Sequence, residues 1–89
     1  MQYRITFIRK VGLNQYSDEE SVGVLEADLL GAAKRLASEY INNWLIDRKI
    51  TVRTRTDWAK DVRRGGLSRE NVVTENGQMA KLIFILREA

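Results

Sequence analysis

The sequence has 89 residues, of which 44% are hydrophobic and 30% are charged, and its formal net charge is +3. Such a length suits a single domain, residues 1–89, with one modest core and the composition of an ordinary globular protein. Because Cys and His are both absent, disulfides, thiolate nucleophiles and the commonest metal ligands and general bases are excluded, and we expect neither enzymatic activity nor a bound cofactor or metal.

The first third of the chain predicts a β-hairpin. Residues 2–10 are rich in β-forming residues and alternate between apolar and polar, which is typical of a strand. Residues 12–21 carry Gly, Asn, Ser and Asp and are expected to form an exposed loop. A second strand over residues 22–27 then leads directly into a helix.

Residues 28–47 predict the one long helix of the chain. Their apolar residues fall in one unbroken arc of a helical wheel, which is the pattern of a helix lying on a sheet. Asp28 suits the N-cap position, where a carboxylate accepts from free backbone N–H groups. Arg48 and Lys49 stand at the expected end, where cations oppose the negative end of the helix dipole.

The second half of the chain predicts further strands. Residues 50–56 alternate so regularly that Arg53 and Arg55 are expected on one exposed side of a strand. Residues 57–70 combine a helical turn around Trp58 with a Gly-Gly break. Residues 71–75 and 79–88 form a predicted hairpin around an Asn-Gly turn, and the apolar run 82–86 indicates a central strand covered on both faces.

This order, β-β-α-β-(β)-β, predicts an α+β domain with a single helix packed on one face of a four- or five-stranded sheet, antiparallel or mixed. In a β-grasp arrangement the last strand would lie centrally and parallel to the first, whereas in a simple layer all neighbours would be antiparallel. Ile8, Ile83 and Ile85 fall on the face away from the helix. We expect that face to be covered by residues 57–64 or by a second copy in a homodimer.

Charge is distributed unevenly, and this points to a candidate binding surface. Residues 11–31 contain five acids and no base, whereas residues 48–69 contain eight bases and two acids. A basic strand, a basic Gly-rich loop and an aromatic side chain together favour contact with nucleic acid. The candidate residues are Arg53, Arg55, Trp58, Lys60, Arg63, Arg64 and Arg69. The alternative is that the arginines form a solvated face and that Trp58 belongs to the core.

Asp57 and Asp61 are four residues apart, a spacing that would put both carboxylates on one helical face, as in a metal-dependent nuclease. A third acid at a recognisable spacing is missing, and ion pairs with nearby arginines explain both residues as well. The acids at residues 18–20 are interpreted as an exposed loop, or alternatively as a mimic of phosphates.

One stretch carries a resemblance to a known group of proteins. The residues are Leu25-Glu26-Ala27-x-x-Leu30-x-x-Ala33-Lys34-Arg35-Leu36-Ala37-Ser38. They resemble the strand-to-helix passage of small phage and prophage β-β-α-β-β proteins, among them type I anti-CRISPR proteins. The resemblance implies an inhibitor that binds an RNA-guided complex and performs no chemistry itself.

Taken together, the sequence predicts a small non-enzymatic binding protein whose partner is a nucleic acid or a nucleoprotein complex. The alternative is an oligomerisation module whose exposed sheet face forms a homodimer. No apolar stretch reaches the roughly 20 residues that a membrane-spanning helix needs, and Arg4 interrupts the first apolar run. We therefore expect a cytoplasmic protein with no membrane partner.

Overall fold

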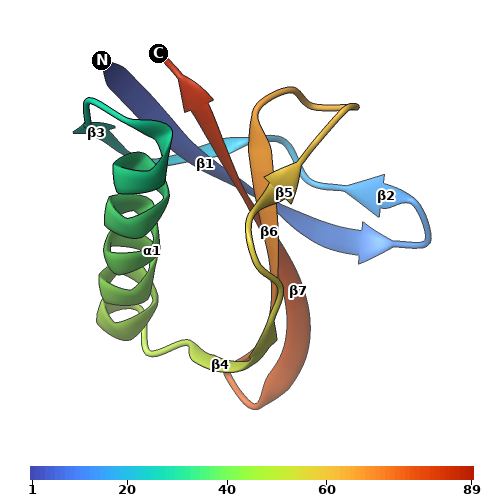
Figure 1. Cartoon of the computed structure of the whole chain (residues 1–89). Helices are drawn as coiled ribbons and strands as arrows, with labels where there is room; N and C mark the ends of the chain where they lie inside the picture. Colours follow the sequence, from blue (N-terminus) through green and yellow to red (C-terminus); the bar gives the residue numbers. More distant parts are fainter.

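Seven strands and one helix form the fold, and the computed structural model describes all residues, 1–89 (Figure 1). The helix lies along one face of the sheet, and the N- and C-termini lie near each other at one end of the molecule. The elements are β1 (Gln2–Gly12), β2 (Gln15–Tyr16), β3 (Glu20–Glu26), α1 (Leu30–Asp47), β4 (Thr51–Arg55), β5 (Ala59–Lys60), β6 (Leu67–Glu75) and β7 (Gln78–Glu88).

Every strand pair in the sheet is antiparallel. β7 lies in the centre between β1 and β6; β2 and β3 follow beyond β1, and β4 and β5 follow beyond β6. The predicted α+β class, with one helix on the sheet, is confirmed, but the sheet has seven strands rather than four or five. Because β1 and β7 are antiparallel, the β-grasp alternative, which needs these strands parallel, is wrong.

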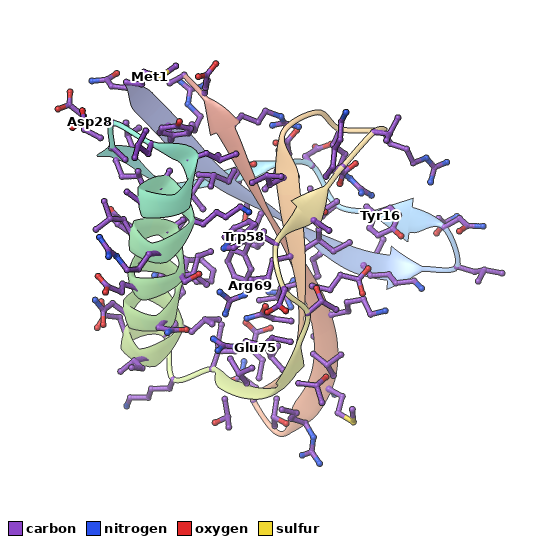
Figure 2. The ribbon with its side chains drawn as sticks, in the orientation of Figure 1. Met1, Tyr16, Asp28, Trp58, Arg69 and Glu75 are labelled. Atoms are coloured by element: carbon purple, nitrogen blue, oxygen red, sulfur yellow. The ribbon has the colours of Figure 1, made fainter.

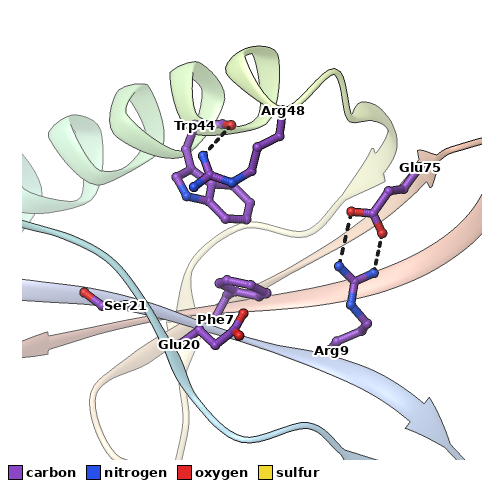
Figure 3. Close-up of a pocket in the computed structure, with 7 residues that line it drawn as sticks. All are labelled: Phe7, Arg9, Glu20, Ser21, Trp44, Arg48 and Glu75. Atoms are coloured by element: carbon purple, nitrogen blue, oxygen red, sulfur yellow. Dashed lines mark hydrogen bonds and ion pairs between the residues drawn. The ribbon is translucent and has the colours of Figure 1, made fainter.

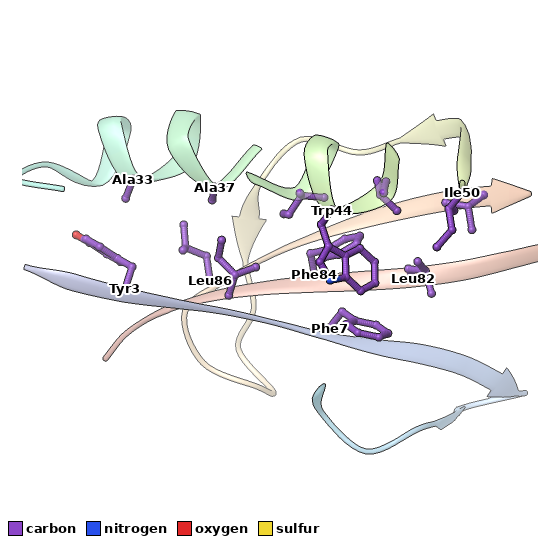
Figure 4. Close-up of a cluster of buried hydrophobic side chains, with 13 residues drawn as sticks. Tyr3, Phe7, Ala33, Ala37, Trp44, Ile50, Leu82, Phe84 and Leu86 are labelled. Atoms are coloured by element: carbon purple, nitrogen blue, oxygen red, sulfur yellow. The ribbon is translucent and has the colours of Figure 1, made fainter. Parts of the chain in front are cut away.

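The main core lies between the sheet and α1 (Figure 4). Strand β7 supplies Leu82, Phe84 and Leu86 to this core, while the intervening isoleucines point to the other face. All five residues of the run 82–86 are buried, so the predicted central strand with two covered faces is confirmed. An alternating strand buries every side chain only when both faces are packed.

Helix α1 buries a stripe of apolar side chains and ends as predicted, with Arg48 at its C-cap. Its start differs from the prediction. The N-cap is Leu29, which has an extended backbone, and no side chain caps the helix, so Asp28 does not serve as the cap. The helix does not combine the length and the apolarity that a bilayer crossing needs. Its buried residues are Ala33, Ala37, Ile41, Trp44 and Leu45.

A second, small cluster covers the other face of the sheet and consists of Ile8, Ile83 and Ile85. These side chains are at most 4% exposed within a single chain, and Tyr16 packs against them. Arg64 extends over the ring of Tyr16, with its guanidinium carbon 4.8 Å from the ring centre. Burial of these isoleucines therefore needs no second copy of the chain.

The helical turn predicted around Trp58 is absent from the segment 57–66. The segment instead forms the short strand β5, which pairs with the first residues of β6, followed by a turn. Strand β6 correspondingly begins at Leu67 rather than at residue 71. Strand β4 lies where it was expected, but all five of its residues are exposed rather than half of them, because only β6 flanks it.

Candidate nucleic-acid interface

Strand β4 and the segment after it form one edge of the sheet, and this edge carries most of the predicted site. Arg53 and Arg55 are exposed on β4, and Lys60 is exposed on β5. Arg63, in the turn that follows, is also exposed. These four cations thus lie in β4, β5 and the turn after β5, and β4 and β5 both flank β6 at this edge of the sheet (Figure 1).

A bulge in β4 separates the two arginines that were expected on one side. Arg53 is the one residue of β4 without a partner on β6. Its Nη1 lies 3.5 Å from Oγ1 of Thr74, on the sheet face away from the helix. Arg55 lies opposite Asn71, which is buried on the helix side. The prediction that both arginines lie on one side of the strand is therefore wrong. The extra residue interrupts the alternation of side chains between the two faces of the sheet, and the arginines extend past opposite faces of β4.

Arg64 is held inside the fold by a neighbouring acid. Its Nη1 lies 3.1 Å from Oδ2 of Asp61, and its backbone N–H donates to Oδ1 of the same carboxylate at 2.9 Å. Burial alone would raise the pKa of Asp61, but the hydrogen bonds from Arg64 and Ser68 outweigh burial and hold that pKa below its usual value. Arg64 is therefore a partly buried residue that is already paired with Asp61.

The Gly65-Gly66 break does not form the open backbone cradle that the sequence suggested. The N–H of Gly65 donates to the carbonyl oxygen of Asp61 at 2.8 Å, and the carbonyl oxygen of Gly66 accepts from the N–H of Asp61 at 3.0 Å. These two bonds close the turn on itself. An anion would find the Gly65 donor already occupied.

Arg69 and Trp58, both predicted as contact residues, lie between α1 and β6 (Figure 2). Arg69 is only 3% exposed, so its assignment as a surface contact is wrong. Its Nη1 donates to Oγ of Ser38 on the helix at 2.8 Å, and its Nε donates to Asn71 at 3.3 Å. Trp58 is partly buried and donates from its indole N–H to the same Ser38 oxygen at 3.0 Å. Trp58 therefore packs against the core, which was the alternative to a surface contact.

Burial is the main influence on Arg69. Burial and the positive charge of Arg55 lower the pKa of Arg69, while the charge of Asp57 opposes this change. No carboxylate forms an ion pair with the guanidinium, and its Nη2 has no hydrogen-bond acceptor. Arg69 thus contributes positive potential beneath the exposed edge without contacting solvent.

The acids of this region do not form a metal centre. Asp57 and Asp61 stand on either side of the short strand β5, so they do not share a helical face. Asp61 is paired with Arg64. The chain contains no group of three acidic side chains close enough together to hold a metal ion. The nuclease hypothesis therefore lacks the convergent acids that it requires.

The structure also shows a charged hollow that sequence reasoning missed (Figure 3). It has a volume of about 530 Å³ and lies beside the end of α1. Glu75 holds Arg9 by two bonds of 2.6 and 3.2 Å, and Arg48 stacks on Trp44 at 4.0 Å. Alternation from Tyr3 through Phe7 would have placed Arg9 on this face, but nothing in the sequence indicates its partner 66 residues away.

Comparisons with known proteins identify no relative of this chain. No family model matches the chain, and neither a curated protein nor a solved structure is significantly similar to it. The resemblance of residues 25–38 to phage and anti-CRISPR proteins therefore stays a prediction.

Proposed function

We propose that this protein binds a nucleic-acid strand along the edge formed by β4, β5 and the turn after β5. The observation that carries the proposal is a row of exposed cations without ion-pair partners. The four ion pairs of the chain use Arg9, Arg64, Lys81 and Arg87. The cations of the edge, which take part in none of them, are Arg53, Arg55, Lys60 and Arg63.

Physical chemistry favours a phosphate backbone as the partner of such a row. An exposed cation that has no partner in its own chain can exchange its counterions for phosphates, and this release drives binding. Because Arg53 and Arg55 extend past opposite faces of β4, they can hold one strand from both sides. A five-residue strand is about 17 Å long, which suits a few consecutive nucleotides of an extended single strand.

A nucleic acid held inside a nucleoprotein complex would present the same phosphates. The resemblance of residues 25–38 to anti-CRISPR proteins implies this class of target. An RNA-guided surveillance complex is therefore a second target to assay beside free oligonucleotides.

The test is fluorescence anisotropy with labelled single-stranded DNA, single-stranded RNA and duplex DNA over a series of salt concentrations. Four phosphate contacts predict that log K falls against log salt with a slope of about −3 for a single strand. The variant Arg53→Glu/Arg55→Glu should lose two contacts, and its slope should become less steep by about 1.4.

The matched control is Lys34→Glu/Arg35→Glu, which changes the net charge by the same amount on the helix rather than on the edge. Affinity that falls at least tenfold further in the edge variant than in the control supports the proposal. Equal losses in the two variants would indicate attraction by net charge alone, and absence of binding at low salt would overturn the proposal outright.

A further inference from the structure

Four strands lie at the edges of the sheet, and the two longer ones, β3 and β4, have unpaired outer sides. β3 pairs only with β1, and β4 pairs only with β6. Each strand therefore presents one row of backbone N–H and C=O groups to which another strand can add. Since β1, β7 and β6 lie between them, the two free edges are on opposite sides of the molecule.

The two edges carry opposite charges. On β3, Glu20 and Glu26 are exposed at the two ends of the strand, and on β4 Arg53 and Arg55 are exposed. None of these four residues takes part in an ion pair. The charges of the two edges therefore do not neutralise each other within one chain, and the β3 edge of one copy is complementary in charge to the β4 edge of another.

Like edges repel one another. Two β4 strands placed edge to edge would bring Arg53 and Arg55 close to their own copies, and two β3 strands would do the same with their glutamates; like charges across a strand pair are destabilising. The β3 and β4 edges, by contrast, attract. Apolar side chains are also available on both, because Val24 is 49% exposed and Val52 is 36% exposed.

We propose that copies of this chain associate head to tail, with β3 of one copy added to β4 of the next so that the sheet continues across the junction. Such an interface is heterologous and gives a ring if the rotation closes and a filament if it does not. β3 and β4 run in the same direction within the antiparallel sheet. Copies with their helices on the same face therefore meet through parallel strands. The inference is independent of nucleic-acid binding, although it uses the same β4 edge.

The experiment is a charge swap followed by sedimentation velocity of the full chain at low and high salt. Wild type should show an average mass that rises with concentration at low salt and returns to that of the monomer at high salt. Two variants, Arg53→Glu/Arg55→Glu and Glu20→Lys/Glu26→Lys, each have two edges of the same sign. Each should remain a monomer alone, and an equimolar mixture should assemble again because both junctions are restored.

Circular dichroism of each variant establishes that it is folded. The helix variant Lys34→Glu/Arg35→Glu should assemble as wild type does. A wild-type chain that stays monomeric at high concentration and low salt overturns the inference, as does a mixture that fails to assemble.

Failure of this inference and failure of nucleic-acid binding give different results. Glu20→Lys/Glu26→Lys should lose assembly and keep the affinity for an oligonucleotide, because it leaves β4 unchanged. Loss of both properties in Arg53→Glu/Arg55→Glu, with loss of assembly alone in the glutamate variant, is the expected pattern.

Discussion

Ser38 is the residue that joins the helix to the basic side of the sheet. Its hydroxyl oxygen accepts from the indole of Trp58 and from the guanidinium of Arg69, and its own proton is donated to the Lys34 carbonyl at 2.9 Å. One side chain thus satisfies two partly or fully buried donors.

Replacing Ser38 with Ala should lower the free energy of unfolding by about 1–3 kcal/mol, because both donors would lose their acceptor while remaining away from water. Urea denaturation followed by circular dichroism measures the change. Ser21→Ala, at an exposed position of β3, serves as the control and should change stability by less than about 0.5 kcal/mol. Equal stabilities of the two variants would contradict this role of Ser38.

Two adjacent glycines provide a second test at this scale. Gly65 and Gly66 both have positive φ, at +80° and +70°. A Cβ on Gly65 would meet open space, whereas a Cβ on Gly66 would collide with the carbonyl oxygen of Leu86.

Gly65→Ala should therefore lower the free energy of unfolding by about 1 kcal/mol, because alanine disfavours the left-handed backbone conformation. Gly66→Ala should lower it clearly more, because its Cβ also collides with Leu86. Thermal unfolding of the two variants side by side gives the difference. A cost that is the same at both positions would mean that the turn moves away from β7 and relieves the collision.

The position of Arg69 shows how a residue assignment can fail when a strand boundary is wrong. The sequence prediction started the strand at residue 71 and left Arg69 in a loop. In the structure the strand begins at Leu67, so Arg69 shares the face of Asn71 and Val73 and turns toward the core. An arginine on a core face is rare, and hydrophobic patterning does not reveal it.

At the scale of elements, a polar network covers the small isoleucine cluster on the face away from the helix. Arg87 on β7 donates to Glu19, and it also donates to the carbonyl oxygen of Arg64 at 3.0 and 2.8 Å. Glu19 in turn accepts from Thr6 on β1 at 2.6 Å. The segments before β3 and before β6 are thereby fastened to the sheet.

This network predicts loss of stability in acid. Hydrogen bonds from Arg87 and then Thr6 hold the pKa of Glu19 below its ordinary value of 4.5. Because the folded pKa is the lower one, the unfolded chain binds the proton first. The stabilisation from Glu19 is therefore complete above about pH 4.5 and is lost as the pH falls through the folded pKa.

Unfolding midpoints measured in urea from neutral pH to pH 3 check this prediction. Glu19→Gln should be less stable than wild type at neutral pH and should show a smaller loss in acid. Glu20→Gln, whose carboxylate forms no ion pair, provides the control and should follow the wild-type curve. A Glu19→Gln curve parallel to wild type would show that other carboxylates cause the acid sensitivity.

Some elements were predictable from local pattern and others were not. The run 82–86 identified the central strand, and Asn76 with Gly77 identified the turn before it, where both residues have positive φ. The bulge at Arg53 was not predictable, because the sequence 50–56 alternates without a break. It arises from pairing with β6, a contact between distant segments, and it decides where the two arginines of the candidate site extend.

At the scale of the whole molecule, the two proposals place nucleic acid and a second copy of the chain on the same β4 edge. Binding of one should therefore exclude the other. Adding an unlabelled single-stranded oligonucleotide to assembled wild-type protein should reduce the average mass of the protein in sedimentation velocity. A mass that rises instead would show that the strand bridges copies without displacing them.

The long strands and the single helix on one face followed from the sequence, but the short strands β2 and β5 did not: residues 12–21 were expected to be a loop, and residues 57–70 to contain a helical turn. The covering of the far face followed only in part. Residues 57–64 were one of the two predicted covers and contribute Arg64, whereas Tyr16 and Glu19 come from a stretch that was expected to be an exposed loop. Those segments meet this face of the sheet through contacts between distant parts of the chain. For the same reason, the sequence overstated the need for a second subunit.

The central place of β7 also has a consequence for synthesis on the ribosome. Strands β1 and β3, helix α1 and strand β6 are all made before β7, yet β7 is the strand that joins the two halves of the sheet. Until β7 emerges, neither β1 nor β6 has its main partner, and the apolar face of α1 has no complete surface to cover. We therefore expect the nascent chain to remain unfolded until β7 is released and then to fold in one cooperative step.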